Sequence, residues 1–85
     1  MTHTIKLNEN FCQAVLDGEK TFEIRENDRG YQTGDYINFE PVYGSPYRNH
    51  SFDVLKNKTY KITYVLNGWG IKNGFVVFSF CEVDK

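Results

Sequence analysis

The chain has 85 residues, which is enough for one domain with one core and too few for a second. Its 10 Lys and Arg residues are balanced by 11 Asp and Glu residues, so the formal net charge is −1. Proteins that bind duplex DNA usually carry a basic excess, because contacts with phosphates supply much of their affinity. The charge therefore argues against duplex DNA as a partner and leaves room for a small local cluster of cations.

No apolar run approaches the roughly 20 residues that a membrane-spanning helix needs, and no signal-peptide core is found. We therefore expect a cytoplasmic protein without a membrane partner. Cys12 and Cys81 lack the short spacing of a metal site and fit either a disulfide or two buried thiols. The thiols are favoured, because free cysteine packs as a small hydrophobe.

The first predicted elements are a strand and a helix. Residues 2–7 alternate apolar and polar side chains, which is the period of a strand. Residues 8–17 change to helical spacing, which places Phe11 and Val15 against the sheet, and Gly18 suits the position after a helix end.

Residues 21–25 return to strand alternation. The pattern predicts that Phe22 and Ile24 face the core and that Glu23 and Arg25 face solvent.

The second half of the chain predicts three more strands. These are residues 36–40, residues 59–66, and residues 75–83, whose nearly continuous apolar run is typical of a strand buried on both faces. Residues 42–58 have no clear pattern and predict a long loop or an irregular hairpin whose apolar residues return to the sheet. Residues 1–85 are thus expected to form one α+β domain: a strongly curved, mostly antiparallel sheet or barrel with one short helix near its start.

Charged residues cluster on and around the strand of residues 21–25. Alternation places Glu23 and Arg25 on one face, with Thr21 beside them and Lys20 at the entrance of the strand. An acidic residue between two cations can orient both of them toward an anionic or polar ligand. The alternative is a solvated face whose charges pair with each other, an arrangement that contributes little to stability.

Two stretches of the chain carry recognisable motifs. Residues 11–35, FCQAVLDGEKTFEIRENDRGYQTGD, contain a predicted helix that ends in Gly, a G-x-K-x-x-E-x-R motif, an N-D-R turn and a G-D pair, formed by Gly18, Lys20, Glu23, Arg25, Asn27-Asp28-Arg29 and Gly34-Asp35. The second stretch is residues 62–80, ITYVLNGWGIKNGFVVFSF. Both stretches resemble the ASCH family (activating-signal-cointegrator homology domains) of the PUA-like superfamily, and within it a small bacterial and phage branch, whereas residues 42–58 do not match.

The resemblance implies a PUA-like β-barrel whose motif borders a cleft for RNA or a nucleotide-like ligand. Tyr31 and Trp69 fall in predicted turns, where an aromatic face could stack on a base or could instead pack over the end of the barrel. The predicted ligand-binding residues are Lys20, Thr21, Glu23, Arg25, Asn27, Arg29, Tyr31 and Trp69.

Two other functions are compatible with the sequence. Some ASCH relatives are small amidohydrolases that deacylate an acetylated cytidine with a Lys, a Thr and a Glu. Lys20 matches that Lys, but Glu23 stands at the position of the Thr, and the segment with the catalytic Glu is missing. A carboxylate cannot replace a hydroxyl nucleophile without changing the intermediate, so we assign no catalytic residue. The third possibility is a protein-interaction module.

Neither a metal nor a cofactor is predicted. His3 and His50 form no convincing ligand set with the cysteines, and the sequence has no Gly-rich phosphate loop. His3 fits better as a hydrogen-bonded residue on the inner side of the first strand. The identity of the ligand and the oligomeric state stay open at this point.

Overall fold

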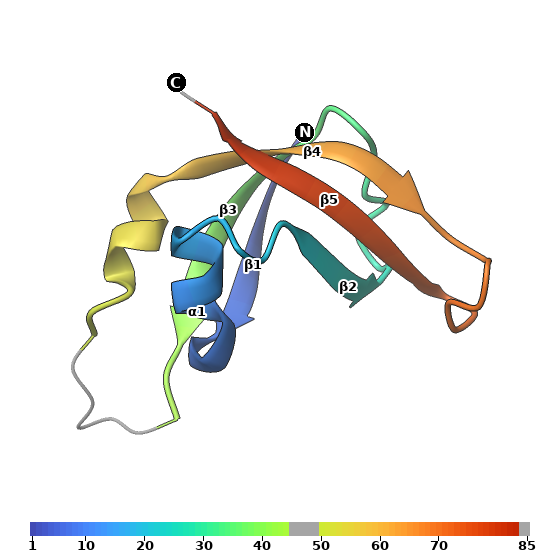
Figure 1. The fold of residues 1–85 in the computed structure, drawn as a ribbon. Helices are drawn as coiled ribbons and strands as arrows, with labels where there is room; N and C mark the ends of the chain where they lie inside the picture. Colours follow the sequence, from blue (N-terminus) through green and yellow to red (C-terminus); the bar gives the residue numbers. More distant parts are fainter. Residues whose placement is uncertain (45–49, 84–85) are drawn as a thin grey trace.

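The computed structural model describes residues 1–44 and 50–83, and within them five strands form one curled sheet beside a short α-helix (Figure 1). The strands are β1 (Thr2–Asn8), β2 (Phe22–Glu26), β3 (Tyr36–Val42), β4 (Thr59–Leu66) and β5 (Phe75–Val83). Their order in the sheet is β1-β3-β4-β5-β2, and only the β1–β3 pair is parallel. The predicted α+β class and the curved, mostly antiparallel sheet are therefore confirmed.

The helix α1 (Glu9–Leu16) follows β1 directly. Asn8 is its N-cap, and the Asn8 Oδ1 atom accepts a hydrogen bond from the backbone N–H of Asn10 at 2.9 Å. Gly18 follows the helix with a φ of 73°, in the left-handed region that glycine adopts without steric cost. Among the described residues, no helix is long and apolar enough to cross a membrane.

The helix packs on β1 and β3 through Cys12 and Val15, which are buried. Phe11 is 48% exposed, so the prediction that it packs against the sheet is wrong. Successive helical residues are rotated by about 100°, and in a helix of eight residues the narrow buried stripe runs through Cys12 and Val15. Phe11 lies at the edge of this stripe and reaches a neighbouring cleft instead.

The core is formed by the inward side chains of β1, β3, β4 and β5. Three of its rings, Phe39, Tyr60 and Phe80, contact one another edge to face with centroids 5.3 Å apart. A 3₁₀ helix (Asp53–Asn57) adds Leu55, whose side chain is fully buried. The apolar residues predicted to return to the sheet within residues 42–58 do so only in part, because Leu55 is buried from this 3₁₀ helix whereas Val54 is 47% exposed. Residues 45–49 of this prediction lie outside the described residues.

The strand β5 is buried on one face only, which corrects the prediction that both faces are covered. Val76 and Phe78 are buried, whereas Val77 is half-buried and Cys81 is exposed. Among the described residues no second layer covers this convex side of the sheet. The prediction of a buried thiol is therefore right for Cys12 and wrong for Cys81, and both cysteines are free.

The strand β2 is oriented opposite to the prediction. Phe22 and Ile24 are 50% and 59% exposed, whereas Glu23 is only 5% exposed. The register explains this difference: Glu23 lies opposite Phe78 and Arg25 opposite Val76, so both share the core face of β5. The predicted alternation of side chains along β2 therefore has the correct period. Its polar side chains face inward, however, and its apolar side chains face outward.

Candidate functional site

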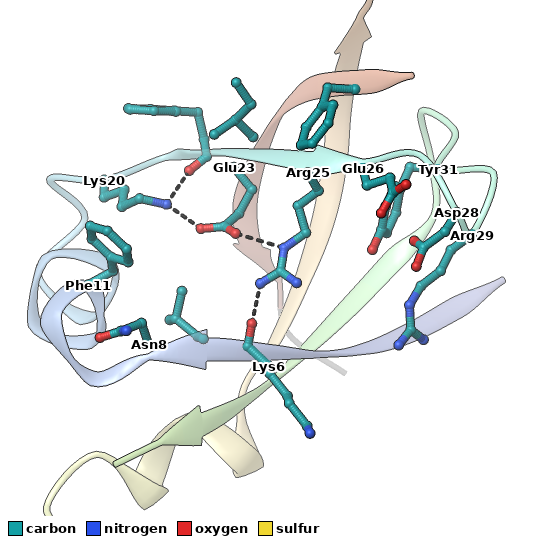
Figure 2. A pocket seen from close by; sticks show the side chains of 14 residues that line it. Lys6, Asn8, Phe11, Lys20, Glu23, Arg25, Glu26, Asp28, Arg29 and Tyr31 are labelled. Carbon is teal, nitrogen blue, oxygen red and sulfur yellow. Dashed lines mark hydrogen bonds and ion pairs between the residues drawn. The ribbon is translucent and has the colours of Figure 1, made fainter. Parts of the chain in front are cut away.

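A cleft of about 630 Å³ lies where the curled sheet stays open, between the edge strands β1 and β2 (Figure 2). This volume is within the range of about 300–1,000 Å³ that is usual for small-ligand sites. The charged residues that line it are Lys6, Lys20, Arg25, Arg29, Glu23, Glu26 and Asp28. The Lys6 side chain points away from the other cleft residues in Figure 2, so three cations and three carboxylates remain around the cleft.

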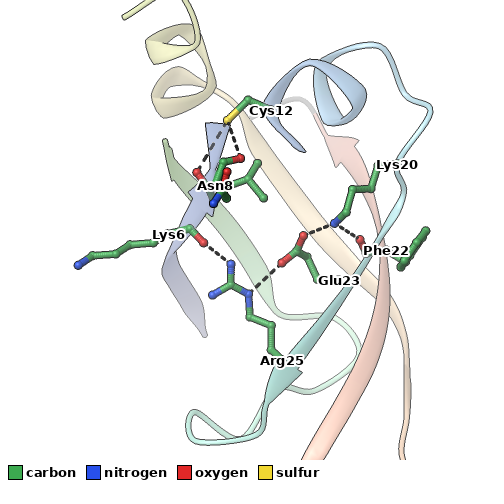
Figure 3. Close-up of polar contacts among 8 residues, drawn as sticks. Lys6, Asn8, Cys12, Lys20, Phe22, Glu23 and Arg25 are labelled. Atoms are coloured by element: carbon green, nitrogen blue, oxygen red, sulfur yellow. Dashed lines mark hydrogen bonds and ion pairs between the residues drawn. The ribbon is translucent and has the colours of Figure 1, made fainter. Parts of the chain in front are cut away.

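Glu23 is the centre of the charged cluster. Its Oε2 atom accepts a hydrogen bond from the Arg25 Nε–H at 2.9 Å, and its Oε1 atom accepts one from the Lys20 ammonium (Figures 2 and 3). The side chains of Lys20 and Arg25 are themselves 16% and 24% exposed. A single buried carboxylate thus fixes the positions of two cations that remain accessible from the cleft.

Lys20 is held on several sides. Its Nζ atom also donates to the carbonyl oxygen of Phe22 at 2.7 Å and lies 5.3 Å and 5.1 Å from the ring centroids of Phe11 and Phe22. An ammonium has three N–H donors, and two are used here, so one is left for a ligand. The exposed position of Phe11 therefore gives one end of the cleft an aromatic wall.

Arg25 connects the two edges of the open sheet. Its Nη2 atom donates to the backbone carbonyl of Lys6 on β1, and among the described residues this is the only hydrogen bond between β1 and β2 (Figure 3). A guanidinium carries five N–H donors, so the bonds to Glu23 and Lys6 leave three for a ligand.

Tyr31 forms part of the cleft wall and is 5% exposed. Its ring contacts the rings of Phe78 and His3, with centroids 4.9 Å and 4.8 Å away, and His3 Nε2 lies 2.8 Å from Asp35 Oδ2. Burial raises the pKa of Tyr31, and the nearby Arg25 guanidinium only partly offsets this, so the phenol is neutral at physiological pH. Of the two alternatives for Tyr31, stacking on a base or local packing, the structure shows local packing. Little of its ring face is accessible to a ligand.

Three of the predicted ligand-binding residues lie outside the cleft. Thr21 is exposed just before β2, and its carbonyl oxygen accepts a hydrogen bond from the Phe80 N–H at 2.9 Å. The Asn27 side chain accepts from the Tyr31 N–H at 3.1 Å and so shapes the turn after β2. Trp69 is 91% exposed in the connection between β4 and β5. The structure therefore brings together Lys20, Glu23, Arg25, Arg29 and Tyr31.

Sequence reasoning did not find Lys6 or Phe11 as cleft residues. The contribution of Lys6 is a backbone carbonyl, which no residue pattern encodes. For Phe11, helical spacing identifies an apolar stripe but does not show that the stripe is centred on Cys12 and Val15. Among residues 1–44 and 50–83, no group of His, Cys, Asp and Glu side chains has an arrangement suited to a metal ion.

The chain was compared with known protein families and with curated proteins. The model of a family described as a domain of unknown function, DUF3850, matches residues 2–80. The matched region includes both strands that border the cleft, the helix, and most of β5. No curated protein matches the chain. Because the family model spans nearly the whole sequence, the chain belongs to the DUF3850 family.

Proposed function

We propose that the cleft between β1 and β2 binds RNA or a nucleotide-like ligand, and that Lys20 and Arg25 hold its phosphate or carbonyl groups. The observation that carries this proposal is the arrangement around Glu23. One buried carboxylate fixes an ammonium and a guanidinium, and both keep N–H donors for a ligand.

The burial of Glu23 separates this cluster from an ordinary surface ion pair. A carboxylate that is 5% exposed has lost most of its contact with water, and burying it is unfavourable unless cations and hydrogen bonds compensate. Two cations share this one anion, so the cluster as a whole is positive. An anionic ligand completes its charge balance, and Arg29 at the rim adds a further cation.

The aromatic residues of the cleft suit the remaining part of a nucleotide. Phe11 and Phe22 are each about half exposed and lie on either side of the Lys20 ammonium. Every nucleobase has a π-face that can stack on such rings. A phosphate held by Lys20 or Arg25 would bring a sugar and a base within reach of this aromatic wall.

The resemblance to the ASCH family supports the same function. Of the residues that carry it, Lys20, Glu23 and Arg25 line the cleft, whereas Gly18, Gly34 and Asp35 do not. We therefore include a PUA-like barrel, a cytoplasmic location and the absence of membrane or duplex DNA partners in this proposal. The curled sheet and the balanced charge of the chain are consistent with it.

Catalysis on an acylated nucleoside is the alternative, and Glu23 is the residue that bears on it. A nucleophile or general base needs access to the reacting atom, but both oxygens of Glu23 are engaged by Lys20 and Arg25. This geometry favours an orienting role for Glu23. A protein-interaction module is the remaining alternative.

The proposal can be tested by titrating the protein with short single-stranded RNA and with mononucleotides. Lys20→Ala and Arg25→Ala should each weaken binding roughly 10- to 100-fold, because each removes a charge-assisted hydrogen bond. Arg25→Lys should weaken it as well, since an ammonium lacks the forked donors of a guanidinium. Lys61→Ala is a matched control, because Lys61 is exposed on β4 away from the cleft.

Glu23→Gln separates the candidate functions. An orienting residue predicts moderately weaker binding and an altered ligand preference, whereas a catalytic residue predicts that turnover of an acylated nucleoside is lost while binding remains. Wild-type affinity in a folded Lys20→Ala, Arg25→Ala double variant would exclude the cleft as the binding site. The interaction module would then be the better explanation.

A further inference from the structure

The connection between β4 and β5 holds its tryptophan in an unfavourable backbone conformation. Gly68, Trp69 and Gly70 have consecutive positive φ angles of 68°, 53° and 88°. The left-handed region costs little for glycine but is an outlier for a bulky L-residue such as tryptophan. Trp69 is also 91% exposed, so its indole contributes almost no packing to the fold.

A strained backbone that carries an exposed aromatic ring has no evident benefit for stability. Strained residues of this kind concentrate at sites where a ligand is held, because function maintains what stability alone would not. The indole of Trp69 presents a large open aromatic face to solvent, which distinguishes it from the buried ring of Tyr31. Of the two aromatic residues predicted to stack on a base, Tyr31 and Trp69, only Trp69 therefore has an accessible ring.

The β4–β5 connection adjoins the cleft. A second pocket, of about 240 Å³, is lined by Asn27, Gly68, Lys72 and Phe75, and Phe75 also lines the cleft itself. The Asn27 N–H donates to the carbonyl oxygen of Gly74 at 2.9 Å, which ties the turn after β2 to this connection. In Figure 1 the β4–β5 connection lies beyond the tip of β2.

We infer that the ligand is single-stranded RNA several nucleotides long, which runs from the cleft past Phe75 and stacks a base on Trp69. This inference rests on the proposed function and extends it from a single nucleotide to a chain. The second pocket is lined by residue types that such a chain needs: Lys72, since an ammonium binds phosphate, and Asn67 and Asn73, since amides bind base edges. A duplex does not fit this arrangement, because its bases are already stacked on one another.

Trp69 is the only tryptophan of the chain, so its fluorescence reports directly on this end of the path. We expect a mononucleotide to occupy the cleft and leave the fluorescence of Trp69 unchanged. RNA oligonucleotides of increasing length should bind more tightly as they lengthen, and should quench Trp69 once they reach it.

Variants of exposed aromatic residues test the same path by affinity. Trp69→Ala should weaken binding of the longer RNA roughly 5- to 100-fold, the usual effect of losing one base–aromatic stack, and should leave mononucleotide binding unchanged. Trp69→Phe should retain part of the affinity. Tyr64→Ala is the matched control, because Tyr64 is an exposed aromatic residue on β4, outside the β4–β5 connection and outside the cleft, and it should have no effect. Circular dichroism establishes that each variant is folded.

The outcomes distinguish this inference from the proposed function. If mononucleotides and long RNA bind with equal affinity and Trp69 fluorescence does not change, the inference is wrong. The cleft then remains the proposed binding site. Quenching of Trp69 that persists unweakened in the Lys20→Ala, Arg25→Ala double variant would also overturn it, because the path would not include the cleft. If the protein binds none of these ligands, the proposed function itself is wrong.

Discussion

At the scale of single residues, Glu23 should be important for stability as well as for binding. Replacing it with Ala leaves the cations of Lys20 and Arg25 close together without their shared anion. We expect the free energy of unfolding to fall by about 2–3 kcal/mol, below the full range for completely buried pairs because both cations are partly solvated. Urea denaturation measures this change.

Glu26→Ala is the matched control for that experiment. Glu26 is an exposed carboxylate on the same strand, and its removal should change stability by less than about 0.5 kcal/mol. Equal, small effects of Glu23→Ala and Glu26→Ala would mean that the charge cluster does not stabilise the fold.

For Trp69 we predict a substitution that increases stability. Trp69→Asn should raise the free energy of unfolding by about 0.5–1 kcal/mol, because asparagine tolerates the left-handed region and an indole that is 91% exposed loses little packing. Thermal denaturation tests this expectation. A lower melting temperature would show that the indole packs in solution. If the variant is more stable and also binds long RNA less well, stability and function are in conflict at this position.

At the scale of elements, the helix α1 makes Cys12 and Cys81 chemically different. Burial, together with the negative charge of Glu9, raises the pKa of the Cys12 thiol to about 11, so this thiol stays protonated at pH 8. Cys81 is exposed on β5. Mass spectrometry after alkylation at pH 8 should show rapid modification of Cys81 alone, with Cys12 reacting only when the protein unfolds. Equal rates would contradict the packing of α1 on the sheet.

The parallel pair of β1 and β3 should become less stable in acid. Burial by itself would raise the pKa of Asp35, but the hydrogen bonds from His3 and from the Gln32 N–H outweigh it and lower this pKa below its ordinary value of 3.8. A carboxyl group with a lowered pKa stabilises the fold above its unfolded pKa, and this contribution is lost as the pH falls through the folded pKa. Stability should therefore decline below about pH 4.

The matched variant for this prediction is Asp35→Asn. It lacks the titrating group, so its stability at neutral pH should be lower and its decline below about pH 4 should be shallower than that of the wild type. Denaturant titrations at several pH values between about 6 and 2.5 provide the comparison. Parallel curves for the two proteins would mean that Asp35 does not carry the acid sensitivity.

The sequence predicts the bounds and the orientation of some strands and helices better than those of others. Residues 59–66 and 75–83 form strands with the predicted bounds, because their β-branched and aromatic residues favour strands wherever they pack. In β2 the period was predictable but the direction was not. Alternation shows that Phe22 and Ile24 share a face, yet only the pairing of β2 with β5 decides which face is turned inward. Phe11 was misplaced for a similar reason, since helical spacing identifies a stripe but not its centre.

At the scale of the whole molecule, the cleft exists because the sheet curls without closing. The edge strands β1 and β2 stay unpaired with each other, and among the described residues only the Arg25 side chain bridges them. The motif residues Lys20, Glu23 and Arg25 could be found from the sequence, because their charges and spacing are local. The carbonyl of Lys6 could not be found, because its role depends on where the two ends of the sheet meet.

The most direct test of the central claim is NMR chemical-shift mapping of the protein with short single-stranded RNA. We predict that the amides that shift most are those of Lys20, Glu23, Arg25 and Arg29 around the cleft, extending to Trp69 as the RNA lengthens. Shifts confined to the convex side of the sheet, around Tyr64 and Val77, would contradict the account, as would a spectrum that no RNA or nucleotide changes.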